Sequence, residues 1–195
     1  MQLNTILFNR FIWTFGLVIS LVACTPAFDW RTVRSDDLYY EALYPSKPSR
    51  AEKTILIDGE KLTMTMEAAR AEDALYAVGL IQIPKNSKIN PNVVLGYLKN
   101  GMLSNLKSEV PANLKVVSIR TAGEPSYELP AEELVQEGLG PDNQTRLLHV
   151  QWVQRKFSDG QTMIYQISVL QNISKSNQHH YAEEHQMFIR GFRPY

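Results

Sequence analysis

Two Asp-Gly pairs, Asp58-Gly59 and Asp159-Gly160, constrain the fold more than any other feature of the chain. Each pair stands between two segments rich in strand-forming residues, which span 54–57, 61–68, 147–157 and 162–170. A short hairpin turn needs residues that accept positive φ angles, and Asp-Gly supplies them. The sequence therefore predicts two β-hairpins and, with them, a fold built largely on antiparallel sheet.

The segment after Asp58-Gly59 alternates strictly. Its apolar residues Leu62, Met64, Met66 and Ala68 are interleaved with Lys61, Thr63, Thr65 and Glu67. A period of two predicts a strand with one buried face and one solvated face, in which the methionines are ordinary core residues. Residues 75–83 are apolar on both faces apart from Gly79 and Gln82, as expected for a central strand covered on both sides.

Two helices are expected. Asn90-Pro91 predicts a helix start, since Asn caps free amide groups and Pro suits the first helical position. Gly96 and Gly101 interrupt the apolar stripe that follows, and we expect close packing on a sheet to be the reason. The second helix has one apolar face near the C-terminal end, with Gly191 as its expected cap; this face comprises Tyr181, Ala182, His185, Phe188 and Ile189.

Further strands are predicted at 39–44, 114–121 and 133–136. The order is then strands with a hairpin, one helix, more antiparallel strands and a last helix, with no repeated βαβ unit. This order predicts the α+β class, a mainly antiparallel sheet with one mid-chain helix and a C-terminal helix packed on it. We expect residues 32–195 to form a single α+β globular domain.

The first two dozen residues are of a different kind. Arg10 is followed by a mostly apolar run over residues 11–22. As a helix this run covers about 20 Å, whereas a spanning helix must cross a hydrocarbon core of about 30 Å. The run is therefore too short to span a membrane and is typical of the apolar region of a signal peptide.

The run ends in Leu21-Val22-Ala23-Cys24, which resembles the lipobox of bacterial lipoproteins. The resemblance implies cleavage between Ala23 and Cys24, a diacylglyceryl group on the Cys24 thiol and, usually, an acyl group on the new amino terminus. Cys24 is the only cysteine of the chain, so it has no partner for a disulfide. We expect residues 1–23 to be a signal peptide and 24–31 to be the lipidated N-terminus and tether. The alternatives are an uncleaved N-terminal anchor and a plain signal peptide in which Cys24 is incidental.

Residue 25 bears on which membrane holds such a lipoprotein. By analogy with enterobacterial sorting, an Asp directly after the lipidated cysteine favours the inner membrane, and here Thr25 stands in its place. The expected location is the bacterial cell envelope, at the periplasmic face of the outer membrane. Trp30 either rests at the lipid interface or packs on the domain edge, and we expect the second.

Charge excludes one class of partner. Twenty Lys and Arg residues balance twenty Asp and Glu residues, so no net charge attracts nucleic acid. The expected partners are the lipid bilayer, reached through acylated Cys24, and an envelope protein. Basic residues near the tether either touch anionic headgroups or form a solvated face, which we favour; they are Arg31, Arg34, Lys47, Arg50 and Lys53.

Two short segments carry a resemblance to a known fold family. Residues 40–48, Tyr-Glu-Ala-Leu-Tyr-Pro-Ser-Lys-Pro, form an extended run entering a Pro-rich turn, and residues 188–192, Phe-Ile-Arg-Gly-Phe, close the chain. With the element order they resemble the PsbP-like fold of the photosystem II extrinsic subunit and of envelope lipoproteins of the DcrB type. The chain also resembles proteobacterial lipoproteins of unassigned role, which begin with Trp-Arg, here Trp30-Arg31, and continue into a hairpin like the one at Asp58-Gly59. The resemblance implies an envelope protein and transfers no catalytic residues.

One cluster of side chains consists of residue types that can bind a metal ion. It consists of His179, His180, Glu183, Glu184 and His185. On a helix His180 and Glu184 are four residues apart and are the candidate pair of metal ligands. The cluster lacks the two-His spacing with an intervening Glu that hydrolytic metal helices show, and His185 falls on the apolar face, so we expect no metal and no cofactor.

Other catalytic patterns are missing from the sequence. It contains no Gly-x-Ser-x-Gly, and Gly138-Leu139-Gly140 precedes a proline rather than a phosphate-binding helix. The expected function is a non-enzymatic binding or assembly module. The first alternative is a membrane-anchored metal-dependent enzyme using His180 and Glu184. The second is a carrier of an apolar ligand, which needs a cavity bounded by Met64, Met66, Leu98 and Met102.

Overall fold

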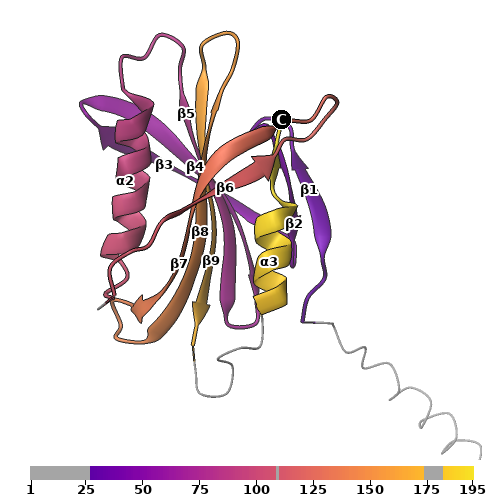
Figure 1. Ribbon diagram of the computed structural model, residues 1–195, viewed down its shortest axis with the longest axis vertical. Coiled ribbons are helices and arrows are strands. Elements are labelled where there is room, and N and C mark those ends of the chain that lie inside the picture. Colours follow the sequence, from indigo (N-terminus) through magenta and orange to yellow (C-terminus); the bar gives the residue numbers. More distant parts are fainter. Residues whose placement is uncertain (1–26, 109, 174–181) are drawn as a thin grey trace, which may run out of the picture.

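The computed structural model describes residues 27–108, 110–173 and 182–195 (Figure 1). Within these residues the elements are β1 (Arg31–Ser35), β2 (Tyr40–Tyr44), β3 (Ser49–Ile57), β4 (Glu60–Ala71), β5 (Ala74–Ile83), α2 (Pro91–Ser104), β6 (Lys115–Arg120), β7 (Glu128–Leu139), β8 (Thr145–Lys156), β9 (Thr162–Asn172), α3 (Ala182–Gly191) and β10 (Arg193–Pro194). The described part of the chain is mostly antiparallel sheet with two helices, so the predicted α+β class is confirmed.

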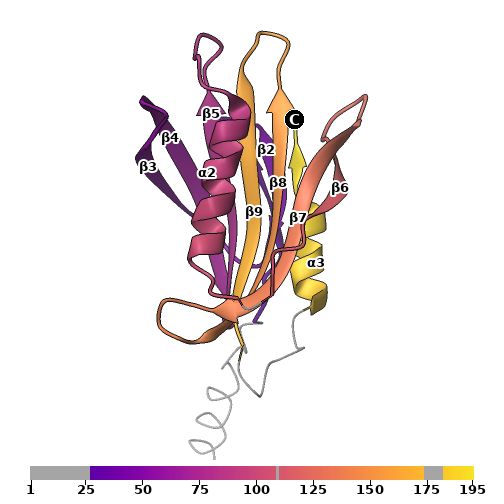
Figure 2. The ribbon, with the colours of Figure 1, turned by 60° about the vertical axis from the view of Figure 1, so that its left-hand side comes forward.

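The strands form two sheets. The large sheet has seven strands in the order β3-β4-β5-β9-β8-β7-β6, and the small sheet has three in the order β1-β2-β10. Helix α2 lies over one face of the large sheet, while α3 and the small sheet lie on the other (Figures 1 and 2). Separate apolar clusters fill the two interfaces, with Val94 and Leu98 under α2 and Phe188 and Ile189 under α3. The large sheet is the middle of three layers.

Both predicted hairpins are present. Asp58 and Gly59 have φ angles of 49° and 82°, and they join β3 to β4 in a two-residue turn. In the second hairpin Gly160 has a φ angle of 92°, and the Phe157 amide donates to the Gln161 carbonyl at 2.9 Å. Turn chemistry alone therefore predicted the pairing of β3 with β4 and of β8 with β9.

The expected solvated face of β4 is covered in its second half. Thr65 and Glu67 are only 7% and 9% exposed, and residues of the small sheet form hydrogen bonds with Glu67. The residues do alternate between two faces, but the prediction of which face is buried is wrong there, since Met64, Met66 and Ala68 are only half-buried. Alternation shows that a strand has two different faces and cannot show that a second layer covers the polar one.

The glycines of the two helices have different roles from those expected. Helix α2 begins at Pro91 as predicted, with the Asn90 side chain accepting a hydrogen bond from the Asn92 amide at 2.9 Å. A Cβ atom at Gly96 or Gly101 would meet nothing within 4 Å, so the expectation of close packing is wrong for both. Gly191 is not a left-handed cap but the last residue of α3. A Cβ there would lie 2.8 Å from the Leu43 Cβ, so this glycine lets α3 approach β2.

Much of the expected tether lies against the domain. Trp30 stacks on Phe28, with centroids 5.8 Å apart, and meets the buried Tyr76 ring edge-on at 6.3 Å. The Asp29 amide donates to the Pro45 carbonyl at 2.8 Å, and strand β1, which we did not predict, begins at Arg31. The prediction that Trp30 packs on the domain edge is confirmed.

The two sheets meet at one corner. Strand β6 pairs with the first half of β7, which is much longer than the predicted 133–136 and includes Pro130. Just beyond β6, the Ala122 amide donates to the Pro194 carbonyl of β10 at 2.9 Å. This bond joins the β6 edge of the large sheet to the small sheet, near the C-terminus and away from the end at which residue 27 enters (Figure 1).

Candidate functional site

Several residues singled out in the sequence lie outside the described part of the chain. These are Ala23, Cys24, His179 and His180. Glu184 is half-buried in the first turn of α3, and its pairing with His180 stays a prediction. Among residues 27–108, 110–173 and 182–195, no group of three or more His, Cys, Asp and Glu side chains is arranged to hold a metal ion.

His185 packs in the core, as its position on the apolar face predicted. It is 3% exposed and meets the Tyr76 ring edge-on, with centroids 5.9 Å apart. Burial, aided by the nearby imidazole of His149, lowers the pKa of His185 to about 4. His185 is therefore a neutral ring near neutral pH.

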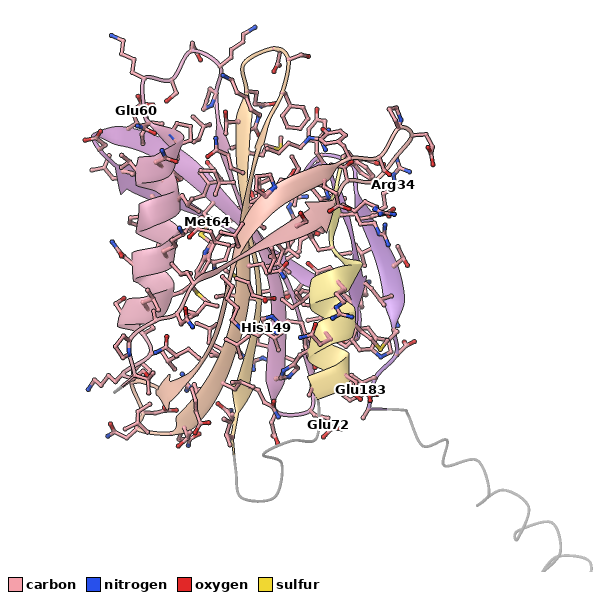
Figure 3. The ribbon with its side chains drawn as sticks, viewed as in Figure 1. Arg34, Glu60, Met64, Glu72, His149 and Glu183 are labelled. Atoms are coloured by element: carbon pink, nitrogen blue, oxygen red, sulfur yellow. The ribbon has the colours of Figure 1, made fainter. Side chains whose placement is uncertain are left out.

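A second imidazole sits beneath α3 in a small polar cluster that the sequence analysis did not find. His149 Nε2 lies 2.8 Å from Glu133 Oε1, and the Gln151 amide donates to the same oxygen at 2.8 Å (Figure 3). Burial raises the pKa of Glu133, but the hydrogen bonds from His149 and Gln151 outweigh it and hold that pKa below its usual value. The cluster ties β7 to β8, and cross-strand register places these side chains together.

Glu67 anchors another buried polar cluster. Its carboxylate accepts hydrogen bonds from the Tyr40 hydroxyl and, at 3.1 Å, from the Ser35 hydroxyl. The Tyr44 hydroxyl donates to the Glu67 carbonyl at 3.1 Å. Burial raises the pKa of Tyr40 and of Tyr44, which keeps both hydroxyls protonated as donors. The cluster fastens the small sheet to β4, and its chemistry is that of a structural bond between layers.

One site open to solvent is a cleft where the β6 edge faces the end of α3. We call it the junction cleft; it has a volume of about 240 Å³. Its lining residues are Ser118, Ile119 and Arg120 of β6, Glu128 of β7, Gln151 of β8, and Ile189, Arg190, Phe192 and Arg193 from α3 to β10. Ile119, Ile189 and Phe192 are buried and form an apolar floor.

The rim of the junction cleft is positively charged. Arg120 pairs with Glu128, with Nε and Oε1 3.2 Å apart. Arg190 and Arg193 are exposed, and neither forms a side-chain ion pair within the described residues. Three guanidinium groups and one carboxylate leave a net charge of +2 around the cleft. Guanidinium groups bind carboxylates through paired hydrogen bonds, so the cleft suits an anion.

Sequence reasoning missed this cleft because its parts are remote in the chain. Arg190 lies in α3 and Arg193 in β10, whereas Arg120 lies in the edge strand β6, about 70 residues earlier. The only local signal was two arginines close to an expected helix end, which is also the usual way to balance a helix dipole. The meeting of β6 with β10 could not be foreseen from that signal.

The three arginines near the tether each pair with an acid. Arg31 pairs with Asp29, Arg34 with Asp36 at 2.7 Å, and Arg50 with Asp37 at 2.6 Å. Figure 3 shows Arg34 far from the end at which residue 27 enters. Each of these arginines is balanced by an acid, as expected for a solvated face.

Two of the methionines assigned to a carrier cavity, Met64 and Met102, fill space in the α2 interface. Leu98 is buried, and Met64 and Met102 pack against the same apolar cluster. A Cβ at Gly79 would lie 2.9 Å from the Met64 Cε, so the Met64 side chain occupies the space above Gly79. Binding of an apolar ligand there stays a prediction.

Comparisons with known proteins add no relative. No protein-family model matches the chain, and no curated protein matches its sequence. None of the helices in the described part of the chain has the length and apolar character that crossing a bilayer requires.

Proposed function

We propose that this protein is a bacterial lipoprotein of the cell envelope whose α+β domain is a non-enzymatic binding module. The observation that carries the proposal is the segment Leu21-Val22-Ala23-Cys24, which follows a short apolar run and contains the only cysteine of the chain. A thioether-linked lipid and an acylated amino terminus together supply the two or more chains that stable anchoring needs. Thr25 after the cysteine favours the outer membrane, with the domain on its periplasmic face.

The docking of Phe28 and Trp30 on the core supports this role. Only residues 25–27 remain between the proposed lipidated Cys24 and the docked segment, and a stretch of that length spans about 10 Å. An anchored domain would then be held against its membrane with one end always facing the lipid. That end carries the start of α3 and the turn between β4 and β5, where Figure 3 labels Glu183 and Glu72.

The short length of residues 25–27 also determines which surfaces of the anchored domain can face a partner. The corner where β6 meets β10 lies on one side of the molecule, well away from the end at which residue 27 enters, so in the anchored protein it is held off the lipid (Figure 1). The junction cleft is open at this corner and is the surface we assign to partner binding. For the fold, we infer a PsbP-like domain, supported by the order of strands and helices and by residues 40–48 and 188–192.

Anchoring is tested by comparing the native protein with a Cys24→Ser variant, with Thr25→Ser as the matched control. The native protein and the control are expected to start at residue 24, to carry a lipid-sized mass and to partition with membranes. Cys24→Ser is expected to lack the lipid mass and to leave the membrane fraction or keep its signal peptide. A native protein that begins at Met1, or that has no added mass, would reject the proposal.

A further inference from the structure

We infer that the junction cleft binds acidic side chains of a protein partner, each carboxylate being held at the mouth of the cleft by Arg190 and Arg193. The inference rests on the proposed binding role and names the chemistry of the partner.

The charge of the cleft has no internal counterpart. Within the described residues, Arg120 has an acid partner, Glu128, and the other two arginines on the rim have none. Arg190 lies in the last turn of α3, where it also meets the negative end of the helix dipole, and Arg193 follows in β10. Two like charges held on one short segment repel each other, and an incoming carboxylate relieves that repulsion.

The shape of the cleft selects a small group. About 240 Å³ is below the usual size of a pocket for a whole drug-sized ligand, which is roughly 300–1,000 Å³. The exposed guanidinium groups stand at the mouth of the cleft, where the terminal carboxylate of a Glu side chain on a partner's surface can reach them without entering the apolar floor. Planar guanidinium groups favour the planar carboxylate through paired hydrogen bonds.

The place of the cleft argues against lipid headgroups as the source of the anion. Helix α3 starts at the end where residue 27 enters and runs ten residues, or about 15 Å, to the cleft (Figures 1 and 3). In the anchored protein the cleft is therefore held well away from the bilayer. An acidic protein segment can reach it there, either from solution or from a neighbouring assembly.

The test is a titration of the full chain, extracted in detergent, with a fluorescent peptide of alternating Glu and Ala, followed by anisotropy. Binding is expected to weaken as salt is added. Arg190→Gln combined with Arg193→Gln is expected to weaken it by about tenfold or more, because both free guanidinium groups are lost. Arg190→Lys with Arg193→Lys keeps the charge but loses the paired hydrogen-bond geometry of guanidinium. Its affinity for the peptide is expected to lie between those of the native protein and the double glutamine variant.

The matched control is Lys85→Gln with Lys88→Gln, which removes the same charge from the exposed loop between β5 and α2. It is expected to leave the affinity within about twofold, well under 1 kcal/mol. Urea unfolding of each variant shows whether the fold is kept, and Arg193→Gln alone, an exposed position, serves if the double variant is unstable.

Three results would overturn the inference. They are an equal loss of affinity in the lysine control, no binding of the acidic peptide by the native chain, and displacement of the peptide by inorganic phosphate or by phosphatidylglycerol vesicles at lower concentrations than by unlabelled peptide. None of them affects the mass measurement on Cys24, so anchoring and acid recognition can fail separately.

Discussion

The ring of Trp30 meets the ring of Tyr76 edge-on, with their centroids 6.3 Å apart. Tyr76 is fully buried in β5 and also touches His185 and Phe188 of α3. The segment that follows the proposed lipidation site is therefore joined directly to the centre of the core. This contact decides how the domain would be oriented on a membrane.

Replacing Trp30 by Ala is expected to free this segment. The side chain is half-buried, so we expect a loss of about 1–3 kcal/mol in the free energy of unfolding, less than for a fully buried aromatic residue. Trypsin should also cleave after Arg31 faster, because β1 loses its support. Urea unfolding and timed proteolysis measure the two effects, with the exposed Val116→Ala as the control. Unchanged proteolysis would contradict the docking.

Stability should fall in mild acid because of His185. Burial holds its pKa at about 4 in the folded protein, whereas the imidazole of the unfolded chain has the ordinary pKa of about 6.5. Between about pH 6.5 and pH 4, His185 is protonated in the unfolded chain but stays neutral in the folded protein. The free energy of unfolding should therefore decrease as pH falls from about 6.5 to about 4, by up to about 3 kcal/mol, and be flat with respect to this group above pH 7.

A His185→Phe variant is the control for that pH dependence. It keeps an aromatic ring beside Tyr76 and has no proton to gain, so its unfolding free energy should change less over the same interval. Glu133, whose pKa is held below its usual value, acts in the same direction at lower pH in both proteins. Equal acid sensitivity of native protein and variant, measured by urea unfolding, would show that His185 is not the titrating group.

Glu67 is expected to matter through the hydroxyls that it accepts. Glu67→Leu would leave the buried Tyr40 and Ser35 hydroxyls without their acceptor, at a cost of about 2–4 kcal/mol in unfolding free energy. Glu67→Gln keeps one carbonyl acceptor and should cost less, about 1 kcal/mol. Thermal unfolding of the two variants gives the comparison, and a leucine variant as stable as the glutamine variant would mean that the small sheet does not depend on these bonds.

Two glycine-to-alanine substitutions should change the free energy of unfolding in opposite directions. Gly96→Ala places a methyl group in open space within α2 and is expected to stabilise the protein by about 0.5–1 kcal/mol. Gly191→Ala drives its Cβ against Leu43 and should destabilise it, because α3 must move away from β2. Urea unfolding of both variants tests the packing of the two helices, and a stabilising Gly191→Ala would contradict the close approach.

The elements that sequence predicted well are those whose cause is local. Asp58-Gly59 and Asp159-Gly160 specify hairpins because the turn itself needs positive φ angles, and Asn90-Pro91 specifies a helix start because the cap lies within the helix's first turn. The apolar run of residues 75–83 predicted a strand covered on both sides, and β5 does lie in the interior of the large sheet. The hairpins and the helix start depend on contacts that a few neighbouring residues make, whereas the strand at 75–83 was recognisable because its residues are apolar on both faces.

Sequence by itself thus determined the two hairpins, the helix starting at Pro91 and the antiparallel α+β class, together with the lipobox-like segment from which we propose an anchor. Only the tertiary structure decided that a second sheet covers Glu67, that Gly191 is a contact with Leu43, and that Arg120 and Arg193 line one cleft. The physical reason is the sequence separation between the residues that make the contacts. Turns and caps are satisfied within a few residues, whereas burial of a polar face and convergence of charges depend on which distant segments pack together.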